Sequence, residues 1–466
     1  MTPLLWGIAA FMGLQFAIGV WVSRRVATED DYLVAGRRMG PVLVTGSIFA
    51  TWFGAETILG GAGSAHARGV SIASTEPFAY GLCIVLAGLV FAGPIWRRRL
   101  TTLADLYRQR YSPLVERVAA VVLIPSSLLW AAAQIRAFGQ VLVVSGASVE
   151  LELALAIACG LVILYTAVGG LLADAATDVF QGILLTIGLL LLLGAVVSAN
   201  KGLGATVDVV MRADRIHLLP RDGVLGWATL EAWAIPVLGS VTATELLSRM
   251  IGARSASVAR NSAYGAGAAY IVVGSVAMMI GLAGGGLAGE IGDAEQVVPT
   301  VARMLLAPWA YVVFAGGFIA AILSTVDSTL LVSAGLLSHN LVIPALGTVD
   351  ERVKVGINRS AVALFGVAAY LIARRAEGVS AIVELASAFG SAGILVTVSF
   401  GLFTQFGGAA AALATIVMGV ASFVGASVLG AATPFLISLA ASVTTYVAAA
   451  VLERSGRLSR AVGTPR

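Results

Sequence analysis

The chain has 466 residues, of which 59% are hydrophobic and 12% are Asp, Glu, Lys or Arg. Soluble domains carry roughly 25% charged residues, and the mean hydropathy of +0.95 exceeds what a soluble core of this length needs. Collagen, disulfide-stabilised scaffolds, disordered tails and ordinary cytosolic enzymes are therefore excluded. The composition predicts an all-α, polytopic membrane protein, because apolar helices of about 20 residues span a bilayer.

Apolar runs and the residues that interrupt them predict about thirteen membrane spans. Their approximate limits are 3–22, 41–67, 74–96, 115–145, 151–168, 172–199, 226–248, 259–284, 305–337, 355–373, 379–404, 408–428 and 432–452. The first run lacks a basic leader and an A-x-A cleavage site, so we expect it to be retained as a span.

The basic residues predict the orientation of these spans. Twenty of the 29 Lys and Arg fall on one predicted side. They are Arg24, Arg25, Arg37, Arg38, Arg97, Arg98, Arg99, Arg108, Arg110, Arg117, Arg249, Arg254, Arg260, Arg352, Lys354, Arg359, Arg454, Arg457, Arg460 and Arg466. Since cytoplasmic loops are enriched in Lys and Arg, we expect an external N-terminus, a cytoplasmic C-terminus and a place in the cytoplasmic (inner) membrane.

The loops between these spans are short, so we expect a single transmembrane domain over 1–466. We divide it into a first span and loop (1–40), two five-span repeats (41–199 and 226–405), and two C-terminal spans with a tail (406–466). A G-x-x-x-x-G-K-[ST] phosphate loop is absent, which argues against direct ATP-driven transport. The pattern indicates neither an enzyme, nor a nucleic-acid partner, nor an obligate protein partner. The segment Trp96–Tyr111 mixes basic and apolar residues, which favours contact with membrane lipids.

Two predicted spans are interrupted in their middle. The second reads GSIFATWFGAETILGGAGSA and contains several glycines beside Glu56, and the seventh reads GWATLEAWAIPVLGSVTATELLSR, with Pro236 and Gly239 central. Each opens a set of five spans, and because five is odd the two sets run in opposite directions. Paired interruptions of this kind are typical of inverted-repeat transporters with a binding site at mid-membrane. The alternative is that the glycines only permit close helix packing.

The ninth predicted span carries hydroxyl groups on one helical face. Ala321, Ser324, Thr325 and Ser328 are spaced by three and four residues. Hydroxyls on one helix, opposite carbonyls freed by an unwound neighbour, could supply the oxygen ligands that sodium requires. The alternative is that these hydroxyls bond back to carbonyls one turn earlier or join neighbouring helices.

Four stretches resemble the sodium:solute symporter family, which has the LeuT-type fold with its 5+5 inverted repeat. They are DDYLVAGRRMGP, ATWFGAETILGGAGS, YTAVGGLLADAATDVFQ and AAILSTVDSTLLVSA, in this order along essentially the whole chain. The resemblance implies Na⁺ as the coupling ion. It implies a sodium site built from carbonyls of Ala50, Phe53 and Ala321 and from hydroxyls of Ser324 and Thr325.

The sixth predicted span carries two acids one helical turn apart. Asp178 matches an aspartate that the family places along the sodium exit route, and ionisable groups at membrane depth are functional candidates. Asp174 and Gln181 share its face. For Asp174 we expect a position at the cytoplasmic interface, capping the start of the helix.

Candidates for solute recognition are fewer and less specific. By position, the residues predicted to line the pocket are Trp52, Glu56, Thr57, Glu76, Trp130, Gln134, Trp233 and Glu245. Glu76 matches a glutamate of sugar-carrying relatives, and Glu245 follows a span break where an acid could hold a cationic group. Proline-carrying relatives have an aspartate where this chain has Phe53, which argues against proline. The aromatic residues could equally anchor the membrane interface.

These features predict a sodium-coupled symporter that imports a small organic solute by alternating access. The first alternative is proton coupling in the same fold, with Asp178 or Glu245 as the proton carrier. Further alternatives are a sensor that binds solute without transporting it, and an ion channel.

Overall fold

The computed structural model describes residues 26–144, 150–212, 215–217, 219, 226–289, 291–376 and 378–455, together with residues 13, 17, 21 and 22. Most of the predicted first span and the end of the C-terminal tail lie outside these residues. Within the described segments the regular structure is helical, and extended pairing is limited to two isolated bridges, Met39 with Ala253 and Val70 with Ile216. The prediction of an all-α protein is confirmed.

The α-helices follow the predicted spans closely. They are α2 (Glu29–Val34), α3 (Pro41–Trp52), α4 (Ala62–Arg68), α5 (Phe78–Leu86), α6 (Gly93–Arg97), α7 (Ala104–Arg110), α8 (Pro113–Val144), α9 (Leu151–Ala199), α10 (Leu203–Arg212), α11 (Trp227–Ala234), α12 (Thr244–Ile251), α13 (Ala256–Gly284), α14 (Val297–Leu305), α15 (Pro308–Leu337), α16 (Ile343–Leu346), α17 (Glu351–Arg375), α18 (Val379–Ala388), α19 (Ser391–Phe403), α20 (Ala409–Val428) and α21 (Pro434–Arg454). π-Helical turns at Glu56–Gly61, Ala87–Ala92, Ile235–Gly239 and Ser338–Val342 join several of them.

Nine helices in the described segments are long and apolar enough to cross a membrane, or ten if the bent pair α3 and α4 forms one span. The count of thirteen is therefore not confirmed. Of the other predicted spans, 151–168 corresponds to a shorter apolar helix, Leu151–Leu164, and 226–248 is divided between α11 and α12.

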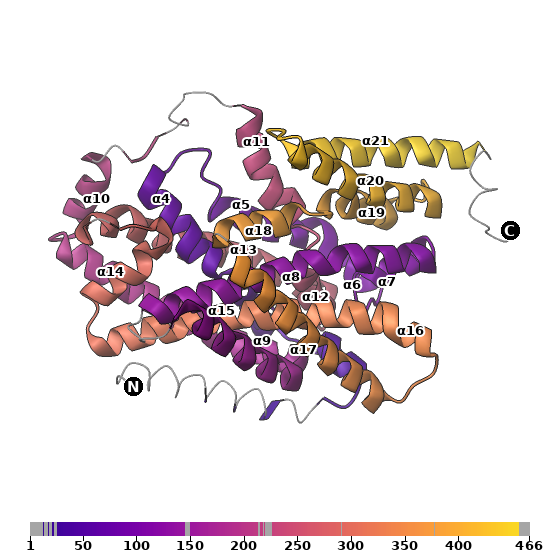
Figure 1. Ribbon diagram of the computed structural model, residues 1–466, viewed down its shortest axis with the longest axis horizontal. Coiled ribbons are helices and arrows are strands. Elements are labelled where there is room, and N and C mark those ends of the chain that lie inside the picture. The colour runs from indigo at the N-terminus through magenta and orange to yellow at the C-terminus, as the bar shows by residue number, and fades with distance from the viewer. Residues whose placement is uncertain are drawn as a thin grey trace.

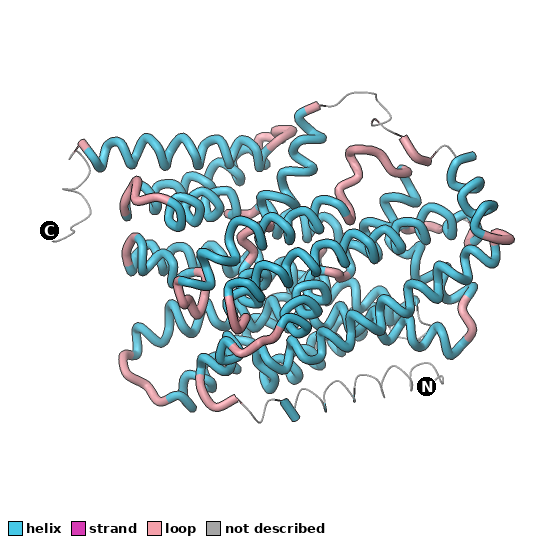
Figure 2. The backbone as a smooth tube through the Cα atoms, turned by 180° about the vertical axis from the view of Figure 1, so that it is seen from behind, coloured by secondary structure: helices cyan, strands magenta, loops and turns pink. Residues whose placement is uncertain are grey.

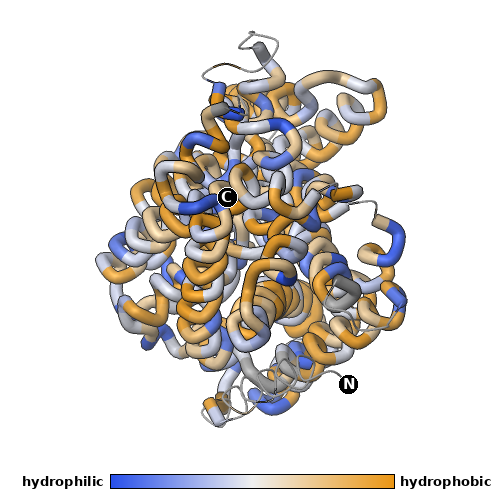
Figure 3. Tube along the Cα trace, turned by 90° about the vertical axis from the view of Figure 1, so that its left-hand side faces the viewer, coloured by the Kyte–Doolittle hydropathy of each residue, from blue (hydrophilic) through white to orange (hydrophobic). Residues whose placement is uncertain are grey.

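Helix α15 lies at the centre of the bundle. In its most apolar window 83% of the residues are buried inside the protein, against 28% for α21, which lies beside α20 at one edge of the molecule (Figure 1). The same edge position is seen from behind in Figure 2. Figure 3 shows predominantly hydrophobic residues along the outer helices, as lipid contact requires. The hydroxyl-bearing helix is therefore enclosed by protein, where its polar groups can find partners.

Helix α9 contains two predicted spans joined by one glycine. Gly170 has φ 66° and ψ 173°, a conformation that side-chain-bearing residues rarely adopt. A Cβ at this position would lie 3.0 Å from the carbonyl oxygen of Tyr32. The bend therefore falls between the predicted limits 151–168 and 172–199.

Candidate functional site

The second predicted span is broken in its middle. Helix α3 ends at Trp52, the π-helical turn starts at Glu56, and the segments on either side are bent by 51°. Gly54 lies in the break, where a Cβ would come within 3.0 Å of Gln134 Oε1 and 3.2 Å of Thr325 Oγ1. Because Gly54 has no side chain, these groups of α8 and α15 can approach the break closely.

The seventh predicted span is broken in the same way. Helix α11 continues into the π-helical turn Ile235–Gly239, and α12 begins at Thr244. Pro236 cannot donate a backbone hydrogen bond in this turn. A Cβ on Gly239 would lie 2.4 Å from the carbonyl oxygen of Ser387, so this break packs directly against the backbone of α18. Both predicted interruptions are therefore present in the structure.

The predicted sodium residues lie where the end of α3 meets α15. Thr325 Oγ1 donates to the carbonyl of Thr51 at 2.9 Å and lies 3.2 Å from the carbonyl of Ala321. Ala50 and Phe53, which lie one residue before and two residues after Thr51, are fully buried. The end of a helix leaves its last carbonyls without partners inside that helix. Carbonyl and hydroxyl oxygens of the kind that bind sodium thus converge at this point.

Asp178 connects the sodium residues to a third helix. Its carboxylate accepts a hydrogen bond from Ser47 Oγ of α3 at 2.5 Å and another from Ser324 Oγ of α15. The Asp178 side chain is completely buried. A buried carboxylate beside neutral oxygen ligands strengthens the attraction of the site for a cation.

A buried arginine closes the network around Asp178. Arg249 of α12 is 0% exposed and forms an ion pair with Asp174. Its Nε donates to Ser47 Oγ at 3.2 Å, and its guanidinium also contacts Ser328. It lies 3.9 Å from Asp178. We call Ser47, Asp174, Asp178, Arg249 and Ser328 the arginine network.

One sequence prediction is wrong here: Arg249, expected in a cytoplasmic loop, is fully buried within α12. Asp174, expected to cap the start of its helix at the cytoplasmic interface, is 1% exposed and pairs with Arg249 instead of capping a helix. Each buried charge is tolerated because the other neutralises it. Arg249 is flanked by Leu246–Leu247 and Met250–Ile251, and these apolar neighbours on both sides were the available signal of burial.

A cavity of about 560 Å³ lies beside the two breaks, within the usual size range of small-molecule sites. Residues of α4, the segment 69–76, the start of α5, α11 and α18 line it. Glu56 and Tyr80 lie at its buried end, and Arg68 and Glu384 are exposed at the other. Of the predicted solute residues, Glu56 and Glu76 line this cavity directly.

Neutral donors hold the two glutamates in place. Gln134 Nε2 donates to Glu56 Oε2 at 2.8 Å, and Thr57 Oγ1 donates to Glu76 Oε2 at 3.2 Å. The hydroxyl of Tyr270 lies 2.5 Å from Thr57 Oγ1 and 3.3 Å from Glu76 Oε2. Gln134 and Thr57 thus hydrogen-bond to the glutamates without lining the cavity themselves. Tyr270 was missed by the sequence analysis, since its partners lie 194 and 213 residues away along the chain.

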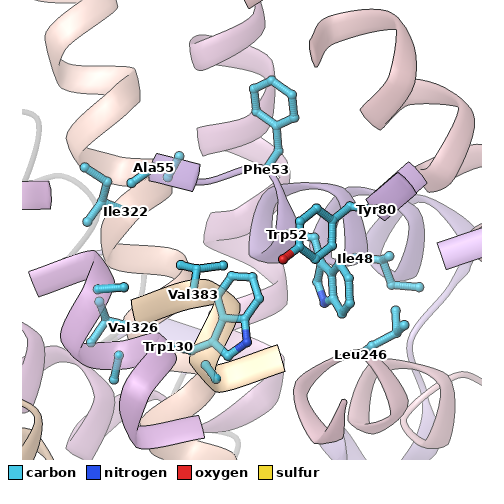
Figure 4. Packing of buried hydrophobic residues seen from close by; sticks show 14 of the residues in the cluster. Ile48, Trp52, Phe53, Ala55, Tyr80, Trp130, Leu246, Ile322, Val326 and Val383 are labelled. Carbon is cyan, nitrogen blue, oxygen red and sulfur yellow. The ribbon is translucent and has the colours of Figure 1, made fainter. Parts of the chain in front are cut away.

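Three aromatic rings, those of Trp52, Tyr80 and Trp130, lie close together in the buried core (Figure 4). The ring centroids of Trp52 and Tyr80 are 5.8 Å apart, those of Trp52 and Trp130 are 6.1 Å apart, and those of Tyr80 and Trp130 are 6.2 Å apart. Tyr80 reaches the cavity, whereas the two tryptophans lie behind it. Of these three aromatic residues, Tyr80 is the one that the sequence analysis did not select.

The remaining two candidates lie apart from this cavity lining. Trp233 donates its indole N–H to the carbonyl of Ile72 at 2.7 Å, which fixes α11 to the segment over the cavity. Glu245 is 4% exposed at the start of α12. Its neighbour Thr244 borders a second cavity of about 20 Å³, which is too small for an organic solute.

At the opposite end of the bundle, where α7 lies in Figure 1, polar side chains from several helices contact one another. His339 contacts Glu29 of α2 at 3.2 Å and Asp105 of α7 at 3.3 Å, and Asn340 donates to Asp105 and to Glu116, each at 2.9 Å. Burial by itself raises the pKa of Asp105, but its hydrogen bond and charge interaction with His339 lower that pKa below its usual value. We call Glu29, Asp105, Glu116, His339 and Asn340 the histidine cluster.

Several known transporters resemble this chain in sequence. The chain is 26% identical to the high-affinity choline transporter 1 of Torpedo marmorata over 414 residues, which cover 82% of this chain and 68% of the relative. It is 27% identical to the sodium/pantothenate symporter of Escherichia coli (strain K12) over 354 residues, which cover 72% of this chain and 71% of that one. Against the human choline transporter the chain spans 61% of the relative's length.

Solved structures show the same fold. A Na⁺-coupled sialic acid symporter in a substrate-bound outward-open state superposes with a TM-score of 0.85 at 16% identity, over 96% of this chain and 98% of that one. A nucleobase–cation symporter in a closed conformation gives 0.60, also at 16% identity, over 91% and 94%. The fold is therefore that of the LeuT-type transporters.

The Sodium:solute symporter family profile matches residues 32–419, which is most of the chain. Its relatives are transporters and not enzymes. The chain belongs to the sodium:solute symporter family.

Proposed function

We propose that this protein imports a small organic solute by sodium-coupled symport with alternating access. The observation that carries the proposal is the meeting of the broken span with α15, where Thr325 Oγ1 bonds to the Thr51 carbonyl. Sodium would bind to carbonyls of Ala50, Phe53 and Ala321 and to hydroxyls of Ser324 and Thr325. Asp178 lies directly behind Ser324, on the path by which the ion would leave.

The solute would enter the cavity beside Glu56 and Glu76. With the orientation predicted from the basic residues, this cavity opens to the outside, and the histidine cluster closes the cytoplasmic end. Sodium bound across the break would hold α3 against α15 and order the cavity wall. Because such coupling is reciprocal, solute must raise the affinity for sodium by the same factor as sodium raises the affinity for solute.

The sodium site can be tested before the solute is known. Thermal unfolding of the purified protein should shift upward with NaCl but not with KCl, since an ion that binds the folded state stabilises it. Ser324→Ala and Thr325→Ala should each weaken sodium binding by about tenfold or more, because each removes a hydroxyl that contacts a charge. Ser333→Ala is the matched control, since Ser333 Oγ donates to Thr329 on the same helix at 2.8 Å.

Uptake into proteoliposomes then tests symport. Choline, pantothenate, proline and sialic acid, which the relatives carry according to their names, are the first solutes to examine. Accumulation should require an inward sodium gradient and should fall in Ser324→Ala and Thr325→Ala. Uptake that is independent of sodium in the wild type and in both variants would contradict the proposal.

Proton coupling is the second candidate, because Asp174 and Asp178 are both buried close to Arg249. Uptake driven by a pH gradient in the absence of sodium, and abolished in Asp178→Asn, would select it. Saturable solute binding without uptake under either gradient would instead indicate a sensor.

A further inference from the structure

The cavity beside the breaks carries an unbalanced charge. Three glutamates line it, namely Glu56, Glu76 and Glu384, whereas Arg68 is the one Lys or Arg among its described lining residues. Arg68 is exposed, and its guanidinium donates to Ser64 Oγ at 2.7 Å. The buried end therefore holds two carboxylates that no lining Lys or Arg side chain pairs with.

Glu56 presents an unused acceptor at this end. One carboxylate oxygen accepts from Gln134, but Oε1 is buried and lacks a hydrogen-bond partner among the residues that the structure describes. The side chain is only 4% exposed. A buried acceptor without a partner is costly, so a ligand that donates a hydrogen bond here gains more than one that does not.

The remaining contacts limit what such a ligand can be. Glu76 receives its hydrogen bonds from hydroxyls of Thr57 and Tyr270, so its charge remains to be balanced. The Tyr80 ring, which packs against Trp52 and Trp130, lines the same cavity as both glutamates. Cations are attracted to aromatic rings, whereas anions are repelled by two carboxylates.

We propose that the solute is a small organic molecule with a protonated primary or secondary amine, whose N–H groups donate to Glu56 Oε1 and whose charge is balanced by Glu56 and Glu76. A quaternary ammonium group has no N–H donor and leaves Glu56 Oε1 without a partner. A neutral polyol donates hydrogen bonds but brings no positive charge to the two carboxylates. This inference rests on the proposed function in placing the solute in this cavity, whereas the chemical class follows from the cavity itself.

A methylation series tests the proposal. Thermal shifts of the purified protein in NaCl are measured with propylammonium and its N-methyl, N,N-dimethyl and N,N,N-trimethyl derivatives, and with 1-propanol and propionate. The same series on a benzylammonium scaffold covers larger solutes. We expect stabilisation by the primary and secondary amines, with a loss of affinity of about tenfold or more for the trimethyl compound. Equal or tighter binding of the trimethyl compound, 1-propanol or propionate, or no response to either series, would overturn the proposal.

Two variants locate the binding site of the amine. Glu56→Gln should reduce amine affinity by about tenfold or more, whereas Glu152→Gln, on an exposed carboxylate paired with Arg374, should leave it unchanged. Unchanged amine affinity in Glu56→Gln would also overturn the proposal. If Glu56→Gln does not fold, Glu76→Gln is used instead, and it should weaken amine binding by removing the other carboxylate of the cavity.

The sodium response separates this inference from the proposed function. Stabilisation by NaCl without any amine response refutes the amine and leaves the sodium site in place. Stabilisation by amines that is identical in NaCl and KCl supports the amine and refutes sodium coupling.

Discussion

The arginine network and the cavity beside Glu56 lie on the two sides of the same broken span. Acidic side chains have a positively charged partner in the network but only neutral partners in the cavity. In the network, Asp174 pairs with Arg249, and Asp178 accepts hydrogen bonds from two serines. In the cavity, Glu56 and Glu76 rest on neutral groups, and Glu56 Oε1 has no partner in the described segments. Removing one member of a buried pair leaves an uncompensated charge and destabilises the fold, whereas an unpaired buried charge is kept at a cost in stability and indicates a ligand.

The largest effect should follow from removing the arginine. Arg249→Gln leaves Asp174 and its neighbours without their buried counter-charge, which should lower the free energy of unfolding by about 3–5 kcal/mol. Thermal unfolding in detergent measures it, with Arg254→Gln as the control because Arg254 is exposed five residues later. If both variants were equally stable, the arginine network would not be a structural element.

An intermediate effect is expected at the histidine cluster. His339→Gln removes the contacts to Glu29 and Asp105 and should cost about 1 kcal/mol, since the side chain is 23% exposed and partly screened. Because the folded-state pKa of Asp105 is lowered, its contribution to stability is present above its ordinary pKa of 3.8 and is lost as the pH falls through the lowered value.

Unfolding curves of wild type and His339→Gln, recorded between pH 7 and pH 3, test the histidine cluster. The variant should lose less stability on acidification than the wild type. Parallel losses in the two proteins would show that His339 does not act on Asp105.

Removing a charge from the cavity should have the opposite effect on stability. Glu56→Gln removes an unpaired charge close to Glu76, so the protein should be as stable as the wild type or more stable by up to about 1 kcal/mol, while solute affinity falls. Asp174→Asn, the same chemical change in the arginine network, is the comparison and should destabilise. A clear loss of stability in Glu56→Gln would mean that Glu56 has a structural role and would break the contrast between the two regions.

The smallest effect is expected at the surface. Glu152 pairs with Arg374, and both side chains are substantially exposed. Exposed pairs contribute between nothing and about 1 kcal/mol, so Glu152→Gln should lie within the error of a thermal unfolding measurement. A large effect there would show that exposure does not distinguish structural from dispensable charges in this protein.

Much of the fold was predictable because membrane helices are visible in the sequence as long apolar runs. The breaks at Gly54 and Gly239 were visible as glycines within apolar runs, and the hydroxyl face of α15 followed from helical spacing. The partners of these groups were not visible. Asp174 and Arg249 are 75 residues apart in sequence, and their pairing depends on how α9 and α12 pack.

The enrichment of Lys and Arg in cytoplasmic loops, which assigned Arg249 to a loop, does not distinguish exposed from buried arginines. The rule counts basic residues near span ends but carries no information on whether an acid lies opposite them. The cavity was predicted in part, since Glu56 and Glu76 line it. Trp233 and Glu245 lie apart from its lining, because a residue's place along a span does not specify which way it faces.

Gly170 joins the predicted fifth and sixth spans into one bent helix. A loop between two spans lets each of them tilt independently, but here one residue joins them, and the backbone of Tyr32 lies against the bend. Asp174 and Asp178 follow about one and two helical turns later. Because only this bend separates the two spans, we expect a tilt of the fifth span to displace the carboxylates of Asp174 and Asp178 as well.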